Sequence, residues 1–334
     1  MKRNPYFDNA KGILIILVVF GHMLWPLHPQ DPKTLGLYKW IYWFHMPCFA
    51  MISGYFSHVT SKKFKFWKDI CNLLIIYCLF MSIQSIILIF YGKKPHFLIG
   101  DYGLWYILSL ISWRILLPHF IKIPYSVFWA FFFAIGVGYF DDVSLQMSLS
   151  RTSCFFPFFI VGYKMMKNEI NIANILNKYL SIFVILISII LVWELKNSKN
   201  TLFLLWCANP YSSFTENIHI CALARMARLS SAFLLCFAIL SIVPKNQSFI
   251  SKIGARSLNI LLFQSLFILV YREHPMMYSF FDHHTIFFTL LGSLFFTFLF
   301  ATNSLSTFFS PFTNPIRFLA DRTRPYRKGY APHG

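Results

Sequence analysis

Charged residues are scarce in this sequence. Only 13% of the 334 residues are Asp, Glu, Lys or Arg, whereas 57% are hydrophobic and the mean hydropathy is +0.57. A soluble domain carries roughly 25% charged residues, so this chain has too little polar surface to cover a water-facing globule. The apolar residues also lie in long runs, which is typical of membrane-spanning helices. The composition therefore excludes a soluble domain and predicts an all-α, polytopic integral membrane protein.

Acidic residues are the rarest charged type. Twelve Asp and Glu stand against 30 Lys and Arg, which gives a net charge of +18. In a soluble protein this excess would indicate nucleic-acid binding. Here most basic residues lie in short segments between apolar runs, where they act as topology signals and suit anionic ligands at a cytoplasmic mouth. We therefore expect the lipid bilayer as a partner and no nucleic acid.

Metal-binding patterns are missing as well. The seven cysteines form no CxxC pair and no cluster with histidine, so neither a metal site nor a bound cofactor is expected. Most of them lie inside apolar runs, where cysteine behaves as a small apolar residue. Cys207 and Cys221 could pair if their loop faced an oxidising compartment, although two free thiols are the favoured interpretation.

The apolar runs predict the number of membrane crossings. With ~20 residues per crossing, there are ten predicted transmembrane helices. The first follows a basic start that resembles a signal peptide, but no small-x-small cleavage site follows, so an uncleaved span is expected. No internal repeat is visible. The ten ranges are 12–28, 40–57, 70–91, 104–120, 125–140, 152–166, 179–195, 224–243, 257–272 and 285–303.

The basic residues between the spans predict the orientation. With the N-terminus in the cytoplasm, most Lys and Arg residues fall on the cytoplasmic side, as the positive-inside rule requires. Both termini are therefore expected in the cytoplasm. Residues 1–310 form one predicted transmembrane domain, and residues 311–334 form a basic cytoplasmic tail. Aromatic and amide residues in the long outer loop 196–223 suit sugar rings, although a lipid-headgroup belt is favoured.

The first two spans carry ionisable residues in apolar surroundings. Lys11 and His22 are three helical turns plus about 20° apart, so they share one face, about 16 Å from each other along the axis. Asp8 lies one turn before Lys11. Such residues usually face a cavity or a partner, and Gly21 allows close approach to His22; the alternative is a hydrogen-bonded packing histidine. His45 could face His22 across a shared cavity, or lie at the membrane interface instead.

Four arginines are further candidates. Arg225 and Arg228 share one helical face, and could bind an anionic acceptor or reach the lipid headgroups. An unpaired guanidinium inside an apolar span is costly, so Arg114 and Arg151 should have a ligand or a partner. Either arginine could bind a group of the substrate. Alternatively, it could form a structural ion pair with Asp101, Asp141 or Asp142.

Several segments carry a family resemblance. The first segment runs from Tyr6-Phe7-Asp8-x-x-Lys11-Gly12 to Gly21-His22. In it, ten residues separate the basic Lys11 from His22, a basic-x10-His pattern. The others are Phe44-His45-Met46-Pro47 with Ser53-Gly54-Tyr55-Phe56, Leu104-Trp105-Tyr106-Ile107 to Trp113-Arg114, and Ser150-Arg151-Thr152 to Gly162-Tyr163. Over nearly its whole length the chain resembles the acyltransferase-3 family of membrane acetyltransferases, especially the branch of fucose 4-O-acetylase and capsular polysaccharide O-acetyltransferases.

Two features depart from the family pattern. Gln264 stands near the end of the ninth span, where many relatives have histidine, which puts the role of that position in question. After the second span, lysines replace the arginine cluster of many members. Lysine attracts phosphate but lacks the bidentate fork of arginine. The lysines are Lys62, Lys63, Lys65 and Lys68.

The resemblance implies acetyl transfer from cytoplasmic acetyl-CoA, a co-substrate, to a hydroxyl of a surface glycan or lipid-linked oligosaccharide at the bacterial cytoplasmic membrane. His22 would act as general base or acetyl carrier, and Asp8 would tether Lys11. The CoA phosphates would rest near Lys11 and the lysine loop, and an arginine would stabilise the oxyanion. The expected residues for acetyl-CoA or substrate are His45, Arg114, Arg151, Trp105, Lys62 and Lys63.

Two other functions compete with this hypothesis. A transporter or flippase for a lipid-linked sugar would explain the spans and buried charges without chemistry. Transporters often show internal repeats and paired broken helices, which this sequence does not show. A non-catalytic scaffold would leave the charges of the first span without a purpose. The sequence does not define the sugar, its hydroxyl position, or O- versus N-acetylation.

Overall fold

The computed structural model describes residues 3–27, 31–57, 63–95, 99–100, 102–143, 146–195, 199–214, 217–274, 285–316 and 318. Within these ranges the chain forms helices and no strand, so the predicted all-α class is confirmed for them. The helices are α1 (Pro5–Leu24), α2 (Pro32–Tyr55), α3 (Lys63–Phe90), α4 (Leu104–Phe120), α5 (Ser126–Gly136), α6 (Leu149–Lys167), α7 (Lys178–Glu194), α8 (Lys199–Trp206), α9 (Ile218–Ile242), α10 (Phe249–Gly254), α11 (Ser257–Glu273), α13 (Thr285–Phe300), α14 (Asn303–Phe308) and α15 (Ser310–Thr313).

Several of these helices have the length and composition of membrane spans. Pro5–Leu24, Phe66–Phe90 and Ile218–Ile242 are long and apolar enough to cross a bilayer, and three shorter apolar helices accompany them. The chain is therefore a membrane protein. A helix lies in each of the ten ranges predicted from the sequence, whereas the number of crossings and the cytoplasmic position of the termini remain predictions.

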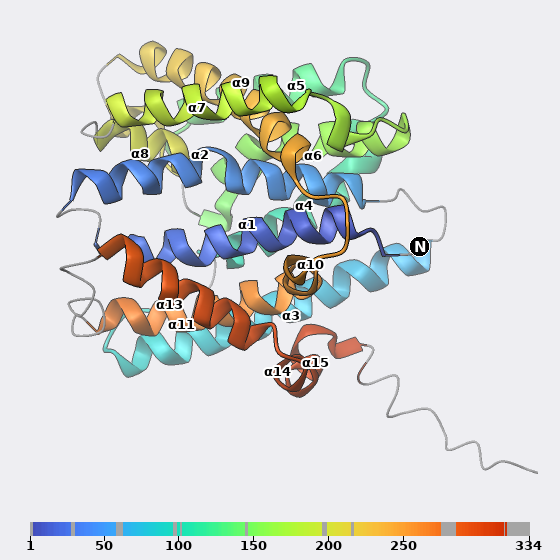
Figure 1. Ribbon diagram of the computed structural model, residues 1–334, viewed down its shortest axis with the longest axis vertical. Coiled ribbons are helices and arrows are strands. Elements are labelled where there is room, and N and C mark those ends of the chain that lie inside the picture. Colours follow the sequence, from blue (N-terminus) through green and yellow to red (C-terminus); the bar gives the residue numbers. More distant parts are fainter. Residues whose placement is uncertain are drawn as a thin grey trace, which may run out of the picture.

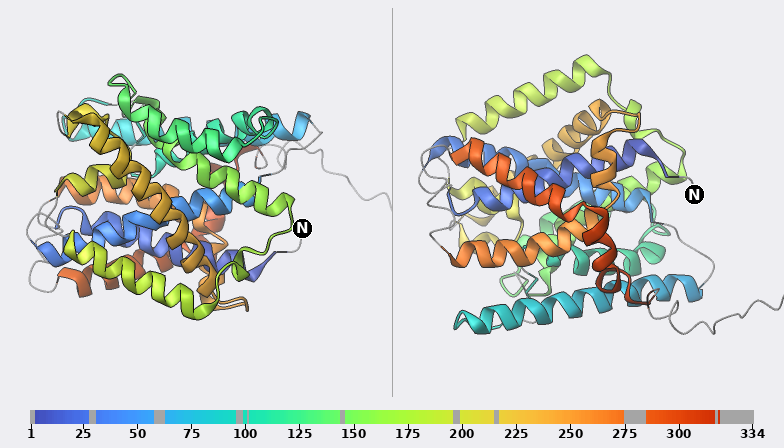
Figure 2. Two further views of the ribbon diagram at one scale, coloured as in Figure 1. Left: turned by 90° about the horizontal axis from the view of Figure 1, so that it is seen from above. Right: turned by 60° about the horizontal axis from the view of Figure 1, so that its bottom comes forward.

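Helix α1 lies in the middle of the bundle. It contacts α2 on one side and α11 and α13 on the other (Figure 1). Helices α3 and α7 lie at opposite edges (Figure 2), and both expose large apolar side chains such as Phe90 and Phe183. An apolar rim around a packed interior is what a lipid solvent requires. Candidate functional side chains are therefore expected on the faces of α1 that pack against other helices.

The N-terminus of α1 is defined by local signals that hydropathy does not record. The Asn4 side chain accepts a hydrogen bond from the Tyr6 amide, and Pro5 occupies the first turn. The helix consequently begins before the predicted start at residue 12. Asn9 then anchors it, because its Nδ2 donates to the carbonyls of Pro244 and Asn246 at 2.8 and 2.7 Å.

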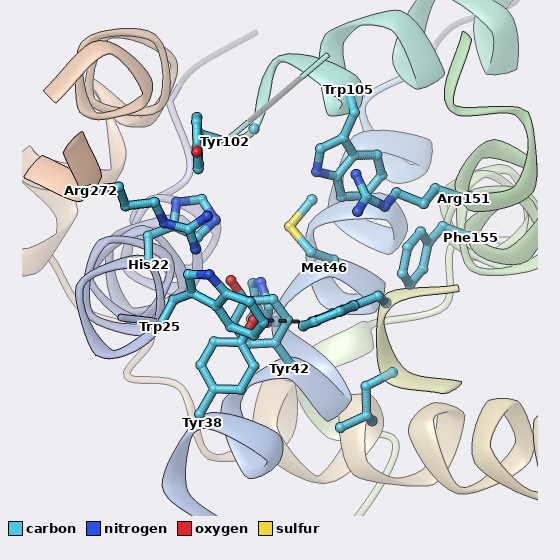
Figure 3. Close-up of a pocket in the computed structure, with 14 residues that line it drawn as sticks. His22, Trp25, Tyr38, Tyr42, Met46, Tyr102, Trp105, Arg151, Phe155 and Arg272 are labelled. Atoms are coloured by element: carbon cyan, nitrogen blue, oxygen red, sulfur yellow. Dashed lines mark hydrogen bonds between the residues drawn. The ribbon is translucent and has the colours of Figure 1, made fainter. Parts of the chain in front are cut away.

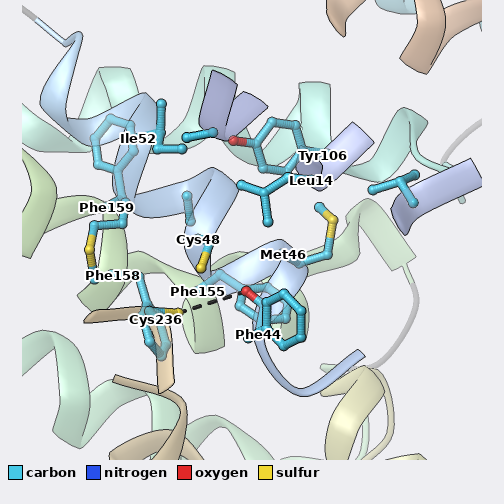
Figure 4. Packing of buried hydrophobic residues seen from close by; sticks show 14 of the residues in the cluster. Leu14, Phe44, Met46, Cys48, Ile52, Tyr106, Phe155, Phe158, Phe159 and Cys236 are labelled. Atoms are coloured by element: carbon cyan, nitrogen blue, oxygen red, sulfur yellow. Dashed lines mark hydrogen bonds between the residues drawn. The ribbon is translucent and has the colours of Figure 1, made fainter. Parts of the chain in front are cut away.

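Glycines allow two very close helix contacts that position the site. A Cβ on Gly254 of α10 would collide with the carbonyl oxygen of Asp8 in α1. At the crossing of α2 and α6, Gly54 faces the Phe159 carbonyl and Gly162 faces the Met51 carbonyl, with no room for a side chain. Around this crossing, the buried cluster shown in Figure 4 packs α1, α2, α6 and α9 together, with Leu14, Cys48, Phe158 and Cys236 among its members.

Candidate functional site

A cavity of about 200 Å³ lies at the end of the bundle where α1 finishes. Its walls come from α1, α2, α4, α6, α8 and α11 and from the segments that follow α1 and precede α4. Figure 3 shows that its lining is chiefly aromatic rings, two guanidinium groups and imidazole. This combination can stack on sugar rings, bind an anion and accept a proton.

His22 lines this cavity near the C-terminal end of α1. Its Nδ1 lies 2.9 Å from Oε1 of Gln264, a fully buried residue of α11. The Gln264 Nε2 donates to the carbonyls of Tyr102 and Leu261 at 3.0 and 3.3 Å. Because both amide hydrogens are used, Oε1 must accept, so His22 Nδ1 carries the proton and Nε2 keeps its lone pair. In this geometry Gln264 holds the orientation and the tautomer of the imidazole.

His45 lines the same cavity from α2, together with His22. It is almost fully buried, and its Nδ1 donates to the Ile41 carbonyl at 2.7 Å, so its ring is tethered to its own helix. Tyr42 lies near both rings, with centroid distances of 4.6 Å to His45 and 6.4 Å to His22. Stacked on Tyr42 at 4.0 Å, Tyr38 extends the aromatic wall.

Two guanidinium groups complete the cavity. Arg151, at the start of α6, lies over the Trp105 ring at 5.2 Å, so both predicted residues reach this site. The other guanidinium belongs to Arg272 at the end of α11, which the sequence interpretation missed. Its charge lies over the rings of Trp25 and Tyr102, at 5.2 and 4.7 Å. An arginine at the end of a predicted span is easily taken for a topology signal, and only its aromatic neighbours distinguish it.

A second charged cluster lies at the opposite end of α1. The Asp8 carboxylate pairs with Lys11 at 2.8 Å and with Arg3 at 3.2 Å. Asp8 therefore tethers two cations, whereas neither Asp8 nor Lys11 lines the cavity of His22. On the stripe between them, Ile15 and Val18 are buried, so this face of α1 turns toward protein and not toward lipid. Lys62 and the side chain of Lys63 lie outside the described residues.

The remaining arginines occupy other places. Arg114 does not line the cavity; its buried Nε has no hydrogen-bond partner among the described residues, and the carboxylate that acts on its charge is Asp69 of α3. Among the described residues, no ion pair joins Arg114 to Asp141 or Asp142. Asp141 accepts instead from Ser212, and Asp101 lies outside the described residues.

Arg225 and Arg228 hold the last turn of α8 and the segment that follows it. Both are buried within the protein, which does not fit the alternative that they reach lipid headgroups. Arg225 donates to the Asn209 carbonyl at 3.1 Å, and Arg228 donates to the Leu205 carbonyl at 3.2 Å. Leu205 lines the cavity but the two arginines do not, so their contribution is to position one wall. All seven cysteines are free, as the sequence favoured.

Comparison with known proteins gives short matches. No family model and no solved structure matches the chain. Nodulation protein NolL of Mesorhizobium japonicum is 48% identical over 67 residues, which are 19% of this chain and 18% of the relative. Nodulation protein NolL of Sinorhizobium fredii is 42% identical over 71 residues, 20% of this chain and 19% of the relative. The chain thus matches less than one fifth of the length of these curated relatives.

Proposed function

We propose that this protein is a membrane-bound O-acetyltransferase. It moves an acetyl group from cytoplasmic acetyl-CoA to a hydroxyl of a bacterial cell-surface sugar. The observation that carries the proposal is His22 in an aromatic cavity, with Gln264 holding its Nδ1 proton and leaving Nε2 able to accept one. The resemblance of residues 6–22, 44–56, 104–114 and 150–163 to acyltransferase-3 proteins supports the same reaction.

The proposed topology separates the two substrates. Ten helices cross the bacterial cytoplasmic membrane, with both termini in the cytoplasm. The cluster of Asp8, Lys11 and Arg3 then lies at the cytoplasmic mouth, where cations attract the phosphates of CoA. Lys62 and Lys63 would add to this charge. His22 lies about 16 Å further along the helix axis, a distance that the long, thin pantetheine arm can span.

The chemistry uses groups that the cavity brings together. The acceptor hydroxyl attacks the thioester carbonyl while His22 Nε2 takes its proton. The resulting oxyanion lies near a guanidinium, for which Arg151, stacked on Trp105, is positioned. Collapse breaks the C–S bond, and the imidazolium returns the proton to the departing CoA thiolate. In the alternative sequence Nε2 attacks the thioester first and CoA leaves as the thiolate. The acceptor hydroxyl then attacks the acetyl-imidazolium, its N–C bond breaks, and the hydroxyl proton passes to the CoA thiolate.

Acetyl transfer from labelled acetyl-CoA to glycan by purified protein tests the proposal. His22→Ala should lower kcat by ~10²–10⁴, the usual contribution of a general base. His119→Ala is the matched control, because His119 lies in α4 outside the cavity. Full activity of His22→Ala would reject the assignment. Movement of a lipid-linked sugar across vesicles without consumption of acetyl-CoA would favour the flippase function instead.

A further inference from the structure

Arg272 has an environment that the acetyl donor does not explain. Its charge lies over the rings of Trp25 and Tyr102, and its buried Nε has no hydrogen-bond partner among the described residues. A guanidinium stacked on aromatic rings keeps its N–H edge available for a planar anion. The nearest carboxylate along the chain, Glu273, is occupied by Lys93 at 2.6 Å.

Two more of the described carboxylates have partners outside the cavity. Asp31 caps α2 by accepting from the amides of Lys33 and Thr34, and Asp141 accepts from Ser212. Among the described residues, no Asp or Glu lines the cavity. The cavity thus presents positive charge in an apolar setting, where an anion is bound most strongly.

The donor does not supply this anion under the proposed function. The phosphates of CoA belong at the Asp8–Lys11 end of α1, and the acetyl thioester that reaches His22 is neutral. The negative group must therefore come with the acceptor. We propose that the acceptor is an anionic sugar, and that Arg272 binds its carboxylate or phosphate while the rings of Trp25 and Tyr42 flank the sugar.

This inference rests on the proposed function but its test does not. Binding to the detergent-purified full-length protein is measured by calorimetry without acetyl-CoA. The probes are methyl β-D-glucuronide, its neutral methyl ester, methyl β-D-glucoside and glucose 1-phosphate. We expect at least one of the two anionic probes to bind about ten- to hundredfold more tightly than the neutral glycosides, the range for a charged hydrogen-bonded pair. Preference for the glucuronide identifies a carboxylate, and preference for glucose 1-phosphate identifies a phosphate.

Variants locate the preference at Arg272. Arg272→Gln should remove the advantage of the anionic probe over the glucoside, and Arg272→Lys should retain part of it, because lysine keeps the charge without the fork. Lys122→Gln is the control and should keep the advantage, because Lys122 is an exposed cation outside the cavity. Thermal unfolding of each variant confirms that it is folded.

Two results would overturn the inference: equal binding of charged and neutral probes, or an anionic preference that Arg272→Gln leaves intact. If the preference is found but no acceptor is acetylated, only the proposed reaction fails. If neutral glycosides are acetylated and bind as tightly as charged ones, only the anionic acceptor fails.

Discussion

Replacing Gln264 with leucine removes the acceptor of the His22 Nδ1 proton at little change in volume. The amide lies 2.9 Å from Nδ1, and its own position is held by the Tyr102 and Leu261 carbonyls. Without it, the ring can rotate or carry its proton on Nε2, which is the nitrogen that must accept. The substitution should therefore reduce kcat and leave the KM for acetyl-CoA unchanged, because the phosphates bind at the other end of α1.

The expected size of this effect follows from the hydrogen bond. A net contribution of about 0.5–1.5 kcal/mol corresponds to a factor of about 2–12 in rate at ~1.36 kcal/mol per tenfold. Loss of the correct tautomer adds to this. In a serine-protease triad, where the orienting group is charged, the wrong tautomer lowers kcat about 10⁴-fold. For a neutral amide we expect a decrease of about 10- to 100-fold.

The assay is steady-state acetyl transfer by purified protein, with three variants compared. Gln264→Glu keeps an acceptor for Nδ1 and should lose less activity than Gln264→Leu. Gln84→Leu is the matched control, because Gln84 is a buried glutamine of α3 outside the cavity, and it should keep the wild-type kcat. Wild-type kcat in Gln264→Leu would refute the tautomer argument.

Two further changes test the other end of α1. Lys11→Ala should raise the KM for acetyl-CoA about tenfold or more with little change in kcat, because a charge-assisted contact to phosphate is lost. Lys122→Ala is the control, because Lys122 is an exposed lysine after α4. An unchanged KM in Lys11→Ala would contradict the binding of the CoA phosphates at this end of α1. Gly254→Ala should destabilise the fold by about 1–3 kcal/mol, because its Cβ would meet the Asp8 carbonyl. Thermal unfolding measures this, with Gly136→Ala as control, since no atom lies within 4 Å of its added Cβ; equal unfolding temperatures would refute the close contact.

The sequence predicted the long helices better than their ends. The range 104–120 coincides with α4. An apolar run of that length in lipid must satisfy its own backbone hydrogen bonds, and a helix does so. The start of α1 was placed seven residues late, since Asn4 and Pro5 act through hydrogen bonding and backbone geometry. The short helices α8 and α10 were not predicted, because neither is long enough to show a periodic pattern.

The candidate site was predicted in part for a similar reason. Lys11 and His22 share a face of one helix, so their relation follows from local geometry. The partner of His22 is Gln264, which lies 242 residues away along the chain. A single sequence carries no signal for such a contact, nor for the stacking of Arg272 on Trp25 and Tyr102. Only the packing of α1 against α11 brings these groups together.

Acetyl transfer across a sealed membrane shows whether the acetyl group passes from the donor on one side to the acceptor on the other. Proteoliposomes hold labelled acetyl-CoA inside and the acceptor sugar outside, and the labelled sugar outside is measured over time. We expect product to form in this arrangement, to depend on His22, and not to form when both substrates are outside. Product that forms only when donor and acceptor share one side of the membrane would contradict the passage of the acetyl group along α1.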